Sequence, residues 1–117
     1  MKHFKSSEFD SPDTPGSGQL MDADFLQLLD DAREIANIPF KINSGYRTTQ
    51  HNMSVGGKVE SSHLKGLAAD ISVKYSRNRF IILNALIAVG FNRIGIAKTF
   101  IHVDSDTSKD KNVYWVY

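Results

Sequence analysis

The sequence contains no cysteine among its 117 residues. Neither a disulfide framework nor a thiolate metal site can form, so any metal ion must be held by nitrogen and oxygen atoms. The sequence also has no excess of charge of one sign, because 14 Lys and Arg stand against 13 Asp and Glu and leave a formal net charge of +1. This balance gives no electrostatic basis for binding nucleic acid or an anionic membrane surface.

Long hydrophobic runs are absent as well. No apolar stretch approaches the length of a transmembrane helix, and none of signal-peptide length follows the lysines near the start. We therefore expect that the protein is synthesised in the cytosol and does not insert into a membrane. Release to the cell wall would then occur through a separate export or lysis system. With 41% hydrophobic and 23% charged residues, the composition is that of a globular protein. We expect one domain over residues 1–117, present as a monomer.

The spacing of apolar residues predicts two helices, over residues 22–37 and 76–89. Asp22 or Asp24 can cap the first helix, and Pro39 ends it because the residue before a proline avoids the helical region. Gly90 stops the second. Residues 1–21 are rich in Pro, Gly, Ser and Asp and are predicted to form an irregular N-terminal arm, which Phe4 and Phe9 anchor to the core.

Alternation of apolar and polar residues predicts strands over residues 40–44, 69–73, 92–96, 100–104 and 113–117. Residues 45–57 read as a long, turn-rich connection. In the strand over 69–73, Asp70 and Ser72 lie on one face, and in the strand over 100–104, His102 and Asp104 lie on one face. Trp115, in the last strand, is either a core residue or part of the wall of a cleft.

Candidate metal ligands stand in two of these strands and just before one of them. His63 and Asp70 are seven positions apart in the stretch from Ser61 to Asp70, and His102 follows in the strand over 100–104. A carboxylate inside a strand is costly unless it is paired, hydrogen-bonded or bound to a metal. Two histidines and one carboxylate around zinc leave a position open for water, which is the catalytic arrangement. The spacing alone is a weak pattern, since a histidine in a strand is more often a satisfied core residue.

Two further sets of polar residues need an interpretation. Arg47 follows the strand over 40–44 and is either a surface charge or a clamp for a carboxylate, which guanidinium binds with two parallel hydrogen bonds. His3 and His51 have no comparable setting and are interpreted as surface residues.

Three ordered motifs resemble those of the M15 peptidase family, the zinc D-alanyl-D-alanine carboxypeptidase and L,D-peptidase group that shares its fold with the signalling domain of hedgehog proteins. The core motif Ser-x-His-x-x-Gly-x-Ala-x-Asp is matched over residues 61–70. Ser-Gly-Tyr-Arg stands at 44–47 and its continuation Asn-x-x-x-Gly-Gly at 52–57. Gly-Phe-x-Arg-Ile-Gly at 90–95 precedes His-x-Asp at 102–104. The resemblance is to the small, phage-type branch of the family.

The resemblance implies an α+β fold, with a small antiparallel sheet and helices packed on one side, as in hedgehog and D-Ala-D-Ala peptidases. It implies that His63, Asp70 and His102 bind Zn²⁺. By the same resemblance, Arg47 binds the carboxylate of the substrate or the developing oxyanion, and Ser61 assists in binding the substrate.

The sequence departs from the family at the general base. Several members carry Glu or Asp three residues before the last zinc ligand, where this sequence has Thr99. Asp104 is the best substitute because it shares a strand face with His102, and it would take the proton from the attacking water. Alternatively, Asp104 orients the imidazole of His102.

The resemblance predicts a zinc-dependent peptidase that hydrolyses a bond in the stem peptides of bacterial peptidoglycan, as a D-Ala-D-Ala carboxypeptidase or a murein endopeptidase. A phage or prophage lysis protein, similar to an endolysin, fits this activity. One alternative is a non-catalytic zinc-binding module on the same fold, which the absence of an acid at Thr99 favours. Another is a structural component of a phage particle.

Overall fold

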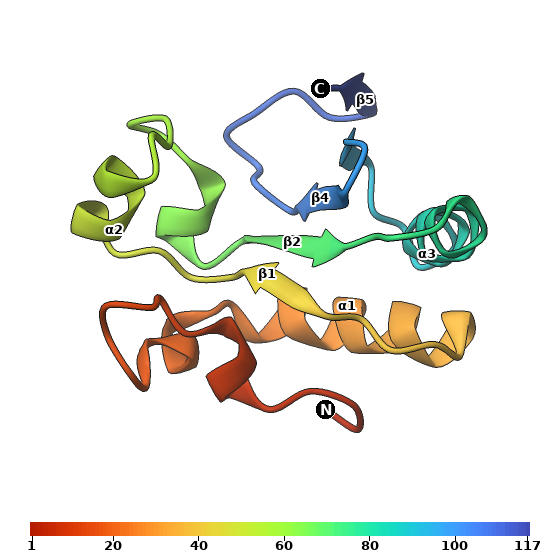
Figure 1. Ribbon diagram of the computed structural model, residues 1–117, viewed down its shortest axis with the longest axis horizontal. Helices are drawn as coiled ribbons and strands as arrows, with labels where there is room; N and C mark the ends of the chain where they lie inside the picture. Colours follow the sequence, from red (N-terminus) through yellow and green to blue (C-terminus); the bar gives the residue numbers. More distant parts are fainter.

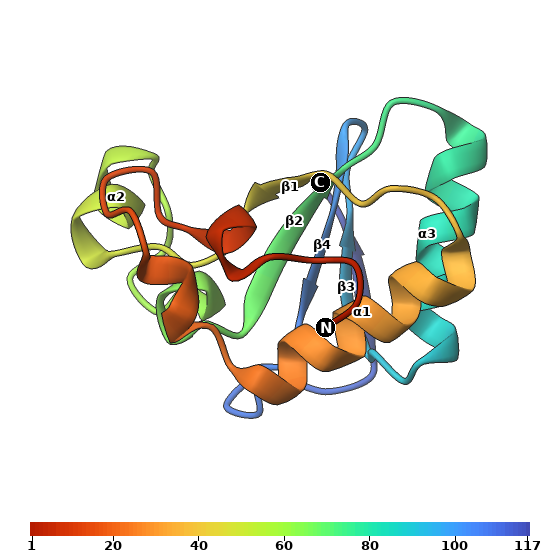
Figure 2. The ribbon, with the colours of Figure 1, turned by 90° about the horizontal axis from the view of Figure 1, so that it is seen from below.

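The computed structural model describes residues 1–117 and contains one five-stranded sheet in the order β1-β2-β4-β3-β5. The strands are β1 Ile42–Ser44, β2 Ala68–Ser72, β3 Arg93–Ile96, β4 Phe100–Asp104 and β5 Val113–Val116. All neighbours pair antiparallel except β5, which runs parallel to β3. Helices α1 (Ala23–Ala36) and α3 (Ser76–Ala88) pack on one side of the sheet (Figures 1 and 2). The α+β architecture predicted from the sequence is confirmed.

Strand alternation divides the sheet into an apolar face and a polar face. The apolar face is fully buried against α1 and α3, and its strand residues are Ala69, Ile71, Ile94, Ile101 and Val103. The polar face carries Asp70 of β2 and His102 of β4, whose Cα atoms are partners in the antiparallel register. The register therefore places these two side chains next to each other, on the face that the helices leave uncovered.

The first helix ends where the sequence predicts. The side chain of Asp22 accepts a hydrogen bond from the Phe25 N–H at 2.9 Å and caps the start of α1. Asn37 follows the last turn with a positive φ of 54°, which asparagine tolerates better than most residues. None of the helices combines the length and the apolar character that crossing a bilayer requires.

The N-terminal arm is largely irregular, as predicted, apart from two 3₁₀ turns, η1 (Ser6–Phe9) and η2 (Ser17–Leu20). Phe4 and Phe9 are buried and pack edge to face with ring centroids 5.3 Å apart. The buried carboxylate of Asp30 in α1 accepts the N–H groups of Lys2 and His3. The arm is therefore fixed to α1 by hydrogen bonds, and Phe4 and Phe9 anchor it in the buried core.

The connection over residues 45–57 is more regular than predicted. It contains α2 (Thr49–Ser54), which begins after Thr48, whose hydroxyl accepts the His51 N–H at 3.1 Å. A third 3₁₀ turn, η3 (Ser62–Lys65), precedes β2. The expectation of a continuous turn-rich loop is wrong, because a threonine cap starts a short helix among residues that otherwise favour turns.

Candidate metal centre

Three potential ligands converge on the polar face of the sheet. His63 comes from η3, Asp70 from β2 and His102 from β4, and one ligand atom of each lies within 4.8 Å of the others. Oδ1 of Asp70 is 2.9 Å from Nδ1 of His102 and 3.5 Å from Nε2 of His63. The structure therefore brings together three residues that are up to 39 positions apart in the chain (102 − 63 = 39).

In each imidazole, the nitrogen that does not face Asp70 already makes a hydrogen bond. Nδ1–H of His63 donates to the carbonyl of Gly45 at 2.8 Å, and Nε2–H of His102 donates to Oδ2 of Asp104 at 2.8 Å. A carbonyl and an ionised carboxylate can only accept, so they fix the position of the ring proton. In the neutral rings, the free lone pairs are then on Nε2 of His63 and Nδ1 of His102, the two atoms that face Asp70.

Electrostatics keep Asp70 ionised. Burial alone would raise the pKa of Asp70, but hydrogen bonds with His102 and His63 hold it well below its ordinary value. Burial alone would lower the pKa of His102, but its hydrogen bonds with Asp104 and Asp70 raise it. The raised pKa favours the form of His102 that also carries a proton on Nδ1, facing Asp70, and a cation that binds the neutral ring at Nδ1 takes the place of that proton.

The donor set fits a zinc ion. It offers two imidazole nitrogens and one carboxylate oxygen, with no sulfur, and the remaining nitrogen of each ring is held by a hydrogen bond. Three protein ligands of these types leave a fourth tetrahedral position for water or substrate. His63 is buried, and Asp70 and His102 are each partly exposed, so one side of the cluster is open to a substrate.

Arg47 lies beside the three potential ligands. Its Nη2 is 3.5 Å from Oδ2 of Asp70, while Nε donates to Oγ of Ser44 at 3.0 Å and Nη1 to Oδ1 of Asn52 at 3.2 Å. These contacts hold the guanidinium plane in one orientation at the site. A positive charge in this position is available to a carboxylate or an oxyanion.

Ser61 is buried directly before η3 and caps it. Its hydroxyl accepts the N–H of His63 at 3.3 Å. In this structure Ser61 therefore supports the turn that carries a potential ligand, and its role in substrate binding stays a prediction.

Asp104 is almost completely buried behind His102. Its Oδ2 accepts from His102, and its Oδ1 accepts from Nε of Arg93 at 2.7 Å and from the N–H of Asp106 at 3.1 Å. Burial alone would raise the pKa of Asp104, but the bonds with His102 and Arg93 lower it. Thr99, at the position of the family's usual acid, is exposed and has no ionisable group.

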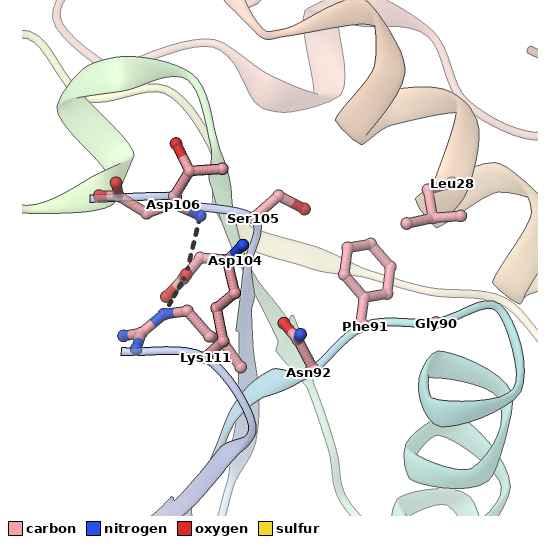
Figure 3. Close-up of a pocket in the computed structure, with 10 residues that line it drawn as sticks. Leu28, Gly90, Phe91, Asn92, Asp104, Ser105, Asp106 and Lys111 are labelled. Atoms are coloured by element: carbon pink, nitrogen blue, oxygen red, sulfur yellow. Dashed lines mark hydrogen bonds and ion pairs between the residues drawn. The ribbon is translucent and has the colours of Figure 1, made fainter. Parts of the chain in front are cut away.

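A cavity of about 150 Å³ lies behind Asp104, and none of the three potential ligands lines it. Figure 3 shows Asp104 and Asp106 at one side of this cavity, joined by the backbone hydrogen bond, with Phe91 and Leu28 at the other.

Trp115 forms one wall of the candidate metal centre and is not part of the core. Its ring is half-buried, 5.5 Å from the ring of His102, and the guanidinium of Arg93 lies 5.1 Å from its centroid. This arrangement requires a glycine on β3, because a Cβ on Gly95 would lie 2.4 Å from Nε1 of Trp115. Of the two places that the sequence allows for Trp115, core and cleft wall, the fold selects the second.

Sequence patterns do not indicate two residues that support the site. Arg93 stands in the motif over 90–95, but nothing in the sequence assigns it a role, and no motif marks Asp106. Both contact Asp104 in the folded chain.

Comparison with known families agrees with the geometry. The family model described as Peptidase M15 matches residues 2–104, a range that includes every residue of the cluster and Arg47. No curated protein matches the chain closely. Since the matched range covers most of the sequence, the chain belongs to the M15 peptidase family.

Proposed function

We propose that this peptidase is zinc-dependent and hydrolyses a peptide bond in the stem peptides of bacterial peptidoglycan. The observation that carries the proposal is the convergence of Nε2 of His63, Oδ1 of Asp70 and Nδ1 of His102. Each ring presents a lone pair to the same point because its other nitrogen donates to a fixed acceptor. The peptidoglycan substrate is proposed from the family motifs.

The residues around the cluster suit hydrolysis of an amide. A zinc ion held there supplies Lewis-acid activation of the scissile carbonyl and of water. Arg47 presents a fixed positive charge that can bind the carboxylate of the substrate or stabilise the developing oxyanion. Ser61 supports the turn of His63 from a buried position.

For Asp104, we propose the orienting role over that of general base. Both of its oxygens are engaged, by His102 on one side and by Arg93 and the Asp106 N–H on the other. A general base must have an oxygen within reach of the proton that it removes. Because both oxygens of Asp104 already accept hydrogen bonds, they are not placed to take a proton from water.

The first experiment measures metal content. Wild type, His63→Ala and His51→Ala are purified and analysed for zinc, with His51 as the control because it lies outside the cluster. We expect one zinc ion per chain in wild type and in His51→Ala, and none in His63→Ala. Equal zinc in wild type and His63→Ala would overturn the proposed site.

The second experiment measures turnover of purified murein by the zinc-loaded wild type, with mass spectrometry of the released peptides. The masses identify which bond is cut and whether the enzyme is a carboxypeptidase or an endopeptidase.

A non-catalytic zinc-binding module is the second candidate, because Thr99 replaces the usual acid and both oxygens of Asp104 already accept hydrogen bonds. Full zinc occupancy without any turnover would favour that module.

A further inference from the structure

Asp106 is a buried carboxylate that the chemistry described above does not use. It lies two residues after Asp104, in the connection from β4 to β5, and only 2% of its surface is exposed. A buried carboxylate is costly unless several donors compensate its charge. The partners of Asp106 therefore indicate what it does.

The side chain of Asp106 holds the 3₁₀ turn that carries His63. Its Oδ2 accepts from Oγ of Ser62 at 2.7 Å, and both carboxylate oxygens are 3.1 Å from Nζ of Lys65. Ser62 and Lys65 stand on either side of His63 in η3. Lys109 adds a second cation, with Nζ 3.7 Å from Oδ2 of Asp106 and 2.9 Å from Oγ of Ser62.

The backbone of Asp106 contacts the support of the other histidine. Its N–H donates to Oδ1 of Asp104 at 3.1 Å, the bond visible in Figure 3, and Oδ2 of Asp104 holds Nε2–H of His102. The connection itself is folded around the same carboxylate, since Oγ and N–H of Ser108 donate to its Oδ1 at 2.6 and 3.1 Å. One residue thus contacts the neighbours of both histidines.

A four-residue 3₁₀ turn has little stability of its own, so its place depends on tertiary contacts. The polar contacts that fix η3 around His63 include the cap by Ser61, the bond from the ring to Gly45, the bond from the Arg47 N–H to the His63 carbonyl at 3.1 Å and the contacts of Asp106. We infer that Asp106 is a positioning residue that sets the distance and orientation between His63 and His102, and so tunes the affinity and geometry of the metal centre. This inference rests on the metal site proposed above.

The experiment compares wild type with Asp106→Asn. An asparagine can still accept from Ser62, but it removes the charge that holds Lys65 and Lys109. We expect zinc affinity, measured by competition with a chelator, to fall about 10- to 100-fold, the range seen when groups that support metal ligands are changed. We also expect altered visible bands of the cobalt(II)-loaded protein, which report coordination geometry.

The matched control is Asp110→Asn, the same chemical change at an exposed aspartate of the same connection, for which we expect wild-type values. If Asp106→Asn does not fold, Lys65→Met serves as the second variant, because Lys65 is exposed and its removal weakens the same contact. We expect a smaller fall in zinc affinity for it, in the same direction.

Two results would overturn the inference, and they are distinguishable. If wild type binds no zinc, the metal site itself fails. If wild type binds zinc and Asp106→Asn shows the same zinc affinity and the same cobalt spectrum, the site stands and Asp106 is a structural contact only, even where the thermal midpoint of the metal-free protein is lower.

Discussion

His102 donates its Nε2–H to Oδ2 of Asp104 over 2.8 Å, and the two residues stand two positions apart on one strand. Side chains at i and i+2 of a strand project from the same face, so β4 itself brings the ring and the carboxylate together. Because Arg93 and the Asp106 N–H hold the other oxygen of Asp104, the carboxylate cannot follow the ring if it turns. This bond therefore decides that Nδ1 is the nitrogen offered to a metal ion.

We expect Asp104→Asn to reduce zinc affinity about 10- to 100-fold, because the amide carries no charge to hold the His102 proton on Nε2. The measurement is chelator competition, with the exposed Asp31→Asn as the control variant. If Asp104 were instead the general base, Asp104→Asn would leave zinc affinity near that of wild type. Turnover would fall, and its pH profile would no longer show the ionisation of an acidic group.

Arg47→Lys is expected to keep full zinc content and to lower kcat/KM about 10²- to 10³-fold. Lysine retains the charge but cannot reproduce the planar group that contacts Ser44, Asn52 and Asp70 together. Turnover of a stem peptide and zinc content are measured on the same samples. Arg77→Lys, at an exposed arginine of α3, is the control. A rate close to that of wild type would remove Arg47 from the transition state.

Zinc binding is expected to release a proton and to strengthen as the pH rises through the pKa of His102, which the fold raises above its ordinary 6.5. The stability of the metal-free protein should instead decrease as the pH rises over the same range. A histidine with a raised pKa contributes stability that is complete below its unfolded pKa and is lost as the pH rises through its folded pKa.

Two measurements check this pH dependence. Calorimetry of zinc binding in two buffers of different ionisation enthalpy gives the number of protons released. Thermal unfolding of the metal-free protein between about pH 5 and pH 9 gives the stability, in a range where Asp70 stays ionised because its pKa is lowered. Zinc binding without proton release would contradict the prediction.

Gly45→Ala is expected to destabilise the fold by about 1–3 kcal/mol and to weaken zinc binding. A Cβ at this position would lie 2.7 Å from Cα and 2.8 Å from Cβ of Phe9, so the arm or the end of β1 must move. The carbonyl of Gly45 holds His63, and the displacement should reach the metal centre. Urea unfolding and chelator competition measure the two effects.

The control for this variant is Gly56→Ala. Gly56 has a φ of 73°, and no neighbouring atom lies within 4 Å of the Cβ that alanine would add, so the substitution costs about 1 kcal/mol of backbone strain without a clash. Zinc affinity should be unchanged. Equal losses of zinc affinity in both variants would show that the contact between Gly45 and Phe9 is not the cause.

Sequence patterns predicted those parts of the structure that depend on interactions between residues close together in the chain. The cap at Asp22 and the helical spacing after it placed α1, and the alternation in β2 and β4 placed Asp70, His102 and Asp104 on the polar side of their strands. The helix α2 was missed because its one clear signal, the cap at Thr48, stands in a segment with the composition of a loop.

Other parts of the site depend on contacts between distant segments, which no local pattern carries. The parallel pairing of β5 with β3 sets Trp115 opposite Gly95, and only this register makes Trp115 a wall of the site. The choice of ligand nitrogen depends on acceptors at Gly45 and Asp104. The burial of Asp106 depends on Ser62, 44 positions away.

Trp115 is the only tryptophan in the sequence, and its ring lies 5.5 Å from that of His102. A protonated imidazole close to an indole quenches its fluorescence, and a metal ion that takes the proton's place changes the emission again. The tryptophan emission of the protein therefore originates beside His102. If zinc binds as proposed, we expect this emission to report occupancy of the site during a titration, without a label, an added chromophore or a substrate.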